Sequence, residues 1–159
     1  MLMFQQLNAK VEAPNYNFSI DTFSEFLPGK KIEDIQAKYG KGEVLSEANG
    51  IKTIKFYVAH VRYKFPVMVQ VNDNQVEDMF ARLPSYFLHD VFFQSLTNRY
   101  GKQTTYKKTG EEAYYVWNKE PLKHIYSAAC TITCFPIFYA IQKAQTTTPS
   151  ILDKMKKAN

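Results

Sequence analysis

The sequence contains few of the residues that build metal and redox sites. Its 159 residues include only two cysteines, Cys130 and Cys134, and no second cysteine pair or HxxxH pattern supplies the other ligands of a zinc site. On a straight strand the two Cα atoms would lie ~13 Å apart, too far for a disulfide. A tight turn between them would bring them within reach. We therefore expect buried free thiols, with a disulfide as the alternative, and no metal or cofactor.

The pattern of a catalytic site is also missing. The histidines His60, His89 and His124 are far apart in the sequence. Gly40-Lys41-Gly42 follows a predicted helix instead of preceding one, so no helix N-terminus would face a phosphate there. A Cys–His nucleophile pair is left open, because such pairs form in space and not in sequence. We expect structural or surface histidines and no enzymatic activity.

No apolar run approaches the ~20 residues that a membrane helix needs, and the first residues lack the basic and apolar regions of a signal peptide. This predicts a cytoplasmic protein, or a periplasmic or secreted one whose signal peptide was removed. The net charge of +5 is mild, and its lysines occur in scattered pairs. Scattered charge favours a solvated surface over nucleic-acid binding.

Aromatic and other apolar residues are abundant. Tyr and Phe number 11 and 12, and 45% of the chain is hydrophobic, which is enough for a packed core. Apolar periodicity predicts helices at residues 21–26, 31–39, 86–100 and 151–157. Alternation predicts strands at 53–58, 67–71, 78–83, 113–118 and 125–141, with a turn at 72–74. The segment 78–83 would also fit a helix.

Two short patterns recur in the same order along the chain. Lys38-Tyr39-Gly40-Lys41 is matched 61 residues later by Arg99-Tyr100-Gly101-Lys102, and Phe56-Tyr57-Val58 is matched 58 residues later by Tyr114-Tyr115-Val116. Such self-similarity predicts an internal duplication.

The stretch CFPIFYAI, residues 134–141, tests the alignment of the two copies. Its Phe135-Pro136 lies 70 residues after Phe65-Pro66. The second copy therefore carries a 12-residue insertion, or the two Phe-Pro pairs belong to different strands. We favour the ungapped offset of 58, because it keeps the apolar parity of every strand. It makes CFPIFYAI the last strand of its copy.

The same parity argument predicts a binding surface. If Ile54, Phe56 and Val58 face the helices, Tyr57 faces the other side of the sheet, and the 58-residue offset extends this assignment to the second copy. The predicted open face carries Tyr57, Met68, Phe80, Tyr115, Trp117, Tyr126 and Phe138. An exposed aromatic patch of this kind marks an interaction site. Alternatively, the N-terminal extension, the C-terminal segment or a partner subunit covers this face.

A helix ending in Tyr-Gly and followed by an antiparallel meander, twice in about 160 residues, resembles the β-lactamase inhibitor protein family. The segment LPGKKIEDIQAKYGKGEV, residues 27–44, also resembles small outer-membrane lipoprotein modules of the barrel-assembly machinery. The resemblance covers residues 21–143. It implies helices packed behind a sheet whose concave face binds protein, and no inhibitory residue carries over.

We therefore predict an α+β fold of two tandem repeats, each a helix or helix-loop-helix followed by a three- to four-stranded antiparallel meander, with the helices packed on one sheet face. Residues 1–18 form an N-terminal extension, 19–84 the first repeat, 85–143 the second, and 144–159 a linker with a short basic C-terminal segment.

The predicted function is non-enzymatic binding of an unidentified protein or peptide through the aromatic face. The main alternative is a small apolar ligand in a pocket between helices and sheet. An enzyme ranks third and a nucleic-acid binder that stacks bases on aromatic rings ranks fourth. A homodimer is left open.

Overall fold

The computed structural model describes residues 20–60, 63–83, 89–109, 112–127, 137–146 and 148–157. Its eight strands are β1 (Glu43–Ala48), β2 (Ile51–His60), β3 (Tyr63–Asn72), β4 (Gln75–Leu83), β5 (Thr105–Thr109), β6 (Glu112–Lys119), β7 (Leu122–Ser127) and β8 (Ile137–Lys143). Its helices are the 3-10 helix η1 (Ile20–Phe26) and the α-helices α2 (Ile32–Tyr39), α3 (His89–Tyr100) and α4 (Ile151–Lys157). Cys130 and Cys134, and the turn considered between them, lie outside the described residues.

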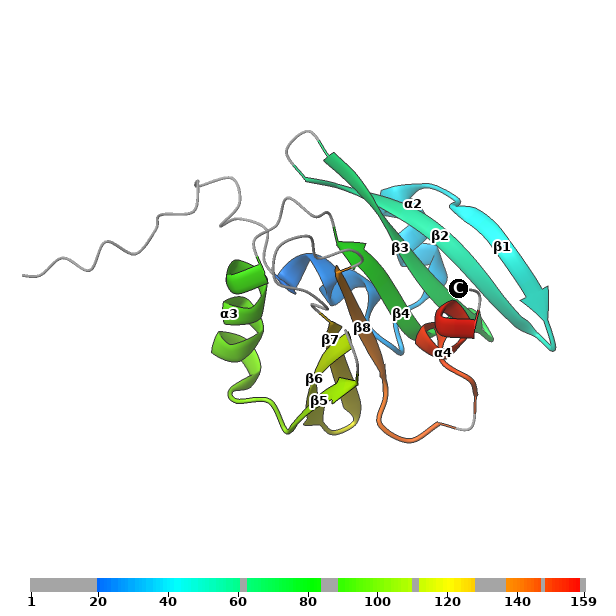
Figure 1. Ribbon diagram of the computed structural model, residues 1–159. Helices are drawn as coiled ribbons and strands as arrows, with labels where there is room; N and C mark the ends of the chain where they lie inside the picture. The colour runs from blue at the N-terminus through cyan, green and yellow to red at the C-terminus, as the bar shows by residue number, and fades with distance from the viewer. Residues whose placement is uncertain are drawn as a thin grey trace, which may run out of the picture.

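All eight strands belong to one antiparallel sheet in the order β1-β2-β3-β4-β8-β7-β6-β5 (Figure 1). β1 and β5 are its edges. The first half of the sheet consists of β1 to β4 and the second half of β5 to β8. Strands β4 and β8 join the two halves through six residue pairs, from Asp78↔Gln142 to Leu83↔Ile137. The predicted antiparallel sheet is therefore confirmed. In the part of the chain that the structure describes, no helix is long and apolar enough to span a bilayer.

The predicted fold of two helix-plus-meander repeats is wrong. The molecule is dominated by one large sheet with a few short helices, and the two halves share one core. Phe23 of η1 packs against Phe92 of α3, with ring centroids 6.1 Å apart, and against Tyr139 of β8 at 5.4 Å. Because residues from both halves fill the same space, neither half forms a unit with its own buried helix.

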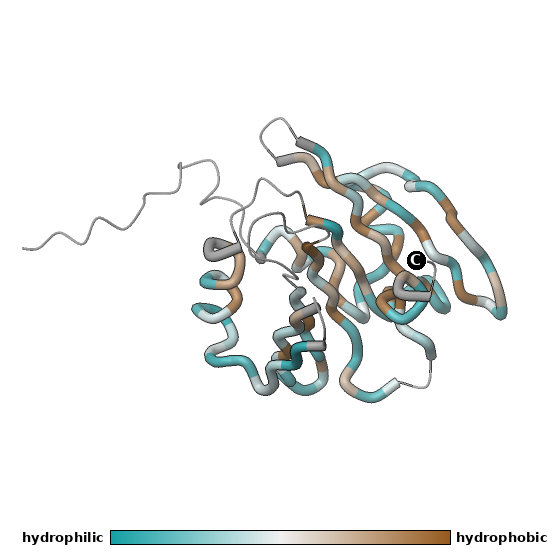
Figure 2. The backbone as a smooth tube through the Cα atoms, in the orientation of Figure 1, coloured by the Kyte–Doolittle hydropathy of each residue, from teal (hydrophilic) through white to brown (hydrophobic). Residues whose placement is uncertain are grey.

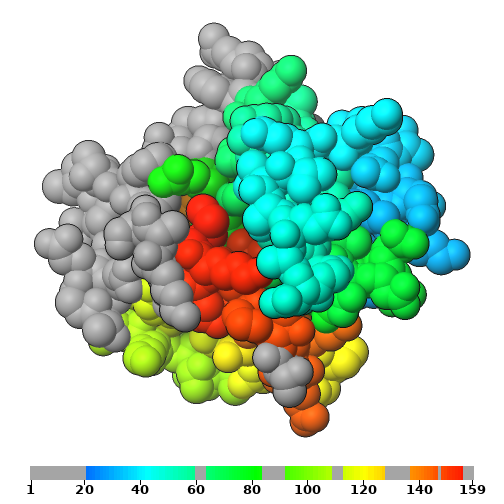
Figure 3. All heavy atoms as spheres, turned by 90° about the vertical axis from the view of Figure 1, so that its right-hand side faces the viewer, coloured from blue at the N-terminus to red at the C-terminus, as the bar shows by residue number. Residues whose placement is uncertain are grey.

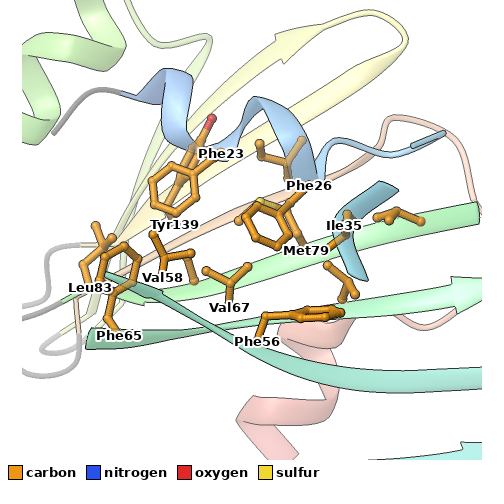
Figure 4. Packing of buried hydrophobic residues seen from close by; sticks show 14 of the residues in the cluster. Phe23, Phe26, Ile35, Phe56, Val58, Phe65, Val67, Met79, Leu83 and Tyr139 are labelled. Carbon is orange, nitrogen blue, oxygen red and sulfur yellow. The ribbon is translucent and has the colours of Figure 1, made fainter. Parts of the chain in front are cut away.

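The main core lies on the sheet face covered by η1, α2 and α3. Figure 4 shows residues of β2, β3, β4 and β8 converging beneath η1 and α2. Its members include Phe23, Phe26, Ile35, Phe56, Val58, Phe65, Val67, Met79, Leu83 and Tyr139, all at most 3% exposed. Along the strands, apolar residues alternate with polar ones (Figure 2). This alternation places one apolar set against the helices.

A second, smaller apolar cluster lies on the opposite sheet face, under α4. It consists of Met68, Phe80, Tyr114, Ile125, Phe138, Ala140, Ile151 and Leu152. Figure 3 shows α4 (red) beside the β1–β2 hairpin (cyan) on this side of the molecule. The chain thus covers both faces of the sheet, but α4, with seven residues, covers only part of the second one.

Several predicted elements are confirmed with their ends. The helix at residues 31–39 is α2, and Gly40 follows it with φ +86° while its N–H donates to the Gln36 carbonyl at 2.9 Å. The basic helix at 151–157 is α4. The predicted turn at 72–74 connects β3 to β4 through Asp73 and Asn74, both with positive φ, a conformation typical of tight hairpins.

Candidate binding groove

The seven residues predicted to share one open face are divided between the two faces. Met68, Phe80 and Phe138 lie in the cluster under α4, and each is at most 7% exposed. Trp117 and Tyr126 lie in the main core and are fully buried. The predicted single aromatic surface is therefore wrong, and the C-terminal segment covers part of the face on which it was placed.

The two remaining residues also lie on opposite faces. Tyr115 packs against the main core. Tyr57 lies two residues after Lys55 on β2, so the two side chains share a face. Lys55 pairs with Met68 of the α4 cluster, which places Tyr57 on the α4 face. Tyr57 is 51% exposed, and the Lys55 ammonium lies 5.4 Å from its ring centroid.

A register error of one residue explains this division. The offset of 58 equated Val67 with Ile125, yet Val67 is in the main core and Ile125 is under α4. Side chains alternate along a strand, so a slip of one residue moves every side chain to the other face. In β8 the offset placed Phe138 correctly: it lies under α4, while Ile137, Tyr139 and Ile141 face the main core.

The described residues contain an open groove of about 780 Å³ beside α4. Strands β5 to β8 form its floor, and α4 with the residue before it forms one wall. Six floor residues define its chemistry: Thr105, Lys107, Tyr114, Val116, Lys123 and Ile125. Ser150, Leu152 and Asp153 form the wall.

Strand register arranges the floor in rows that run across the sheet. Lys123 stands between Asn118 and Gln142 in a polar row. The next row is mainly apolar, since Val116 pairs with Thr105 on one side and with Ile125 on the other.

The third row pairs Lys107 with Tyr114. An apolar stripe thus runs across the floor with one lysine on each side of it.

A buried polar network fixes α4, and therefore the wall, to the sheet. The Asp78 carboxylate accepts hydrogen bonds from the Gln70 amide at 2.8 and 3.0 Å and from the Ile151 backbone N–H at 2.8 Å. Gln70 also donates to the Pro149 carbonyl at 2.9 Å, and its own side-chain oxygen accepts from Lys154. Gln70 and Asp78 are at most 5% exposed. Burial raises the pKa of Asp78, and the hydrogen bonds from Ile151 and Gln70 oppose that rise.

A second buried polar cluster lies on the main-core face and does not line the groove beside α4. His124 Nδ1 lies 2.6 Å from the Tyr139 hydroxyl, and the Tyr100 ring covers the His124 ring at 4.2 Å. His124 is 2% exposed, so this cluster is structural. Among the described residues, no group of three or more His, Cys, Asp or Glu side chains is placed to hold a metal ion.

Burial lowers the pKa of His124 to about 4 from an ordinary value of 6.5, which predicts acid sensitivity. In the unfolded chain His124 becomes protonated below about pH 6.5, whereas in the folded protein it stays neutral down to about pH 4. The free energy of unfolding therefore falls as the pH falls from about 6.5 towards 4. Between pH 7 and pH 5 we expect a loss of about 2 kcal/mol in the free energy of unfolding. Urea unfolding at both pH values measures it.

The matched control is His124→Gln, which keeps a hydrogen-bonding group but does not titrate. The loss between pH 7 and pH 5 should shrink by most of that amount in this variant. An unchanged pH dependence would show that another group causes the acid sensitivity.

Sequence reasoning missed the groove because it missed β5, and with it Lys107. The strand was detectable, since TYKKTGEEAYYV contains two β-favouring runs around a glycine-containing turn. β1 was missed in the same way, although Asn49-Gly50 between residues 43–48 and 51–60 is a strong hairpin signal. Lys123 and Asp153 carried no signal, because a single charged residue beside a strand or in a helix is ordinary.

Comparison with known proteins gives only distant similarities. No protein family matches the chain, and neither does any curated protein. A DUF4309 family protein from Bacillus subtilis is similar in structure, with a TM-score of 0.45 and 8% identity over 74% of this chain and 80% of that one. A cysteine-rich secretory protein from Staphylococcus aureus has a TM-score of 0.43 and 12% identity, covering 73% of this chain and 44% of its own. The resemblance to the β-lactamase inhibitor protein family stays a prediction.

Proposed function

We propose that this protein binds an extended segment of a partner protein, without catalysis, in the groove between α4 and strands β5 to β8. The observation that carries the proposal is the contrast between the two sheet faces. On one face the main core is packed, and its residues are nearly all buried. On the other, α4 covers only part of the sheet and leaves a groove of about 780 Å³ with an apolar floor.

The shape of the groove favours a peptide over a small molecule. Ligand pockets enclose most of a small ligand's surface, whereas this groove has a sheet as its floor and opens beside the edge strand β5. Its mixed lining, with Val116 and Ile125 next to Lys123, resembles the mixture of apolar centre and polar rim found in protein interfaces. A small apolar ligand is the second candidate, because the volume lies within the usual range of ~300–1,000 Å³ for ligand pockets.

Val116→Glu tests the proposal. Val116 is half-buried on the groove floor, so a glutamate there blocks the apolar stripe and leaves the main core intact. Phage-displayed random 12-residue peptides selected on the wild-type protein should lose at least about tenfold in affinity for this variant, a cost of about 1.4 kcal/mol. Val44→Glu is the matched control, because Val44 is 54% exposed on β1, at the other edge of the sheet.

The outcomes separate the candidates. Peptides that bind wild type and Val44→Glu alike but not Val116→Glu support the proposal. Failure to select any peptide, or selection of peptides that ignore Val116→Glu, overturns it. If peptides fail while the dye 1-anilinonaphthalene-8-sulfonate binds wild type and not Val116→Glu, the small-ligand function replaces it.

A further inference from the structure

Two lysines line the groove, and no ion pair between described residues joins either of them to a carboxylate. Lys107 lies on β5 and Lys123 on β7. Each ion pair found among the described residues involves other cations, namely Lys38, Lys52, Lys55, Arg99 and Lys143. An ammonium group at the rim of an apolar floor attracts carboxylates, and it contributes to specificity and to the association rate. The charge of the groove therefore selects among the segments that could enter it.

The register fixes the separation of the two lysines. Lys123 is opposite Asn118 and Lys107 is opposite Tyr114, which lie four residues apart on β6. Four residues along a strand span ~14 Å, and two strand spacings add ~10 Å sideways, so the two Cα atoms lie ~17 Å apart. An extended peptide covers ~14 Å in four residues, and the flexible lysine side chains close the remainder.

We propose that the groove recognises an extended segment with the pattern acidic–x–apolar–x–acidic. This inference rests on the proposed function, because it names the chemistry of the segment that the groove takes. In an extended chain, residues i, i+2 and i+4 point to the same side. Carboxylates at i and i+4 face Lys123 and Lys107, and the apolar residue at i+2 contacts the row of Val116 and Ile125.

The single acidic residue of the wall limits how many acidic groups the segment carries. Asp153 lines the groove, and no ion pair joins it to either lysine in the described part of the chain. The two lysines and this carboxylate leave a net charge of +1 on the lining. A uniformly acidic peptide would therefore be repelled by Asp153, whereas two spaced acidic residues are accommodated. Asp153→Asn should strengthen binding of the spaced peptide several-fold.

Three synthetic peptides measure the pattern directly. The probe is GSETVTEGS, which has glutamates at i and i+4 around a valine. GSQTVTQGS removes the charges, and GSEETVTGS keeps the composition but places the glutamates together. By calorimetric titration at low salt, we expect both controls to bind about tenfold more weakly than the probe.

Variants of the protein complete the test. Lys107→Glu should weaken binding of the probe about tenfold. Lys108→Glu should leave it within twofold, because Lys108 alternates with Lys107 and points to the other sheet face. The double variant Lys107→Glu, Lys123→Glu should instead prefer GSKTVTKGS, in which lysine replaces glutamate.

Failure of this inference differs from failure of the proposed function. If the probe binds no better than its controls, or if Lys107→Glu behaves like Lys108→Glu, the acidic pattern is overturned. The phage-selected peptides and Val116→Glu test groove binding in a separate experiment. The proposed function is therefore judged independently of the acidic pattern.

Discussion

Trp117→Ala is expected to lower the free energy of unfolding by about 4 kcal/mol, the usual cost of removing a large buried aromatic side chain. Trp117 is fully buried, and its indole N–H donates to the Gly101 carbonyl at 2.8 Å. Its ring lies 6.4 Å from Tyr115 and 6.0 Å from Phe93 of α3. The substitution therefore removes apolar packing between α3 and β6, and it leaves the Gly101 carbonyl without its donor.

Urea unfolding at neutral pH measures this effect, and Val116→Ala is the matched control. Val116 precedes Trp117 on the same strand but points into the groove, so its truncation should cost less than about 1.5 kcal/mol. Equal losses for the two variants would contradict the assignment of Trp117 to the core and Val116 to the groove.

The burial of Trp117 changes which variants can report on binding. On the sequence alone Trp117 belongs to the binding surface, so its alanine variant would be the natural test. In the structure, loss of binding by that variant would follow from loss of the fold. Val116→Glu and Lys107→Glu avoid this ambiguity because both side chains line the groove.

Asp78→Ala should release α4 from the sheet. The carboxylate is the shared acceptor for Gln70 and for the Ile151 N–H, and both donors would remain buried without it. Removing one partner of such a buried network lowers stability by about 3 kcal/mol. We expect the backbone amides of residues 150–157 to exchange with solvent roughly a hundredfold faster, since 1.36 kcal/mol corresponds to a factor of ten.

Hydrogen exchange followed by mass spectrometry measures the release, with Asp153→Ala as the control. Asp153 is an exposed carboxylate on α4 itself, and its side chain takes no part in the network around Asp78. Because α4 is one wall of the groove, Asp78→Ala should also weaken the selected peptides. Unchanged exchange at 150–157 would show that the apolar contacts of Ile151 and Leu152 hold α4 without the polar network.

The pH dependence of Asp78 runs against that of His124. Burial raises the pKa of Asp78 above its ordinary value of 3.8. Its contribution to stability is therefore complete below about pH 3.8 and is lost as the pH rises through the higher folded pKa. The charged carboxylate is costly to bury, and its hydrogen bonds offset only part of that cost. The pH dependence of wild-type stability therefore contains two effects of opposite sign. Comparison with His124→Gln isolates the contribution of His124.

Secondary structure could be predicted from the sequence wherever interactions between neighbouring residues determine it. The spacing of Ile32 and Ile35 with Gly40 behind them predicted α2, and residues 151–157 predicted α4. Alternation predicted parts of β2, β3 and β4, and Asn72-Asp73-Asn74 predicted the turn between β3 and β4. Each of these elements depends on interactions between residues that are close together in the sequence, so the local pattern is enough to predict it.

The sequence by itself thus determined the bounds of α2 and α4 and parts of six of the eight described strands. Only the tertiary structure decided that β4 pairs with β8, that Trp117 is core, and that Lys107 and Lys123 flank one apolar stripe. The reason is that pairing between distant strands sets the register. A register change of one residue leaves the local pattern unaltered but exchanges the buried and exposed faces.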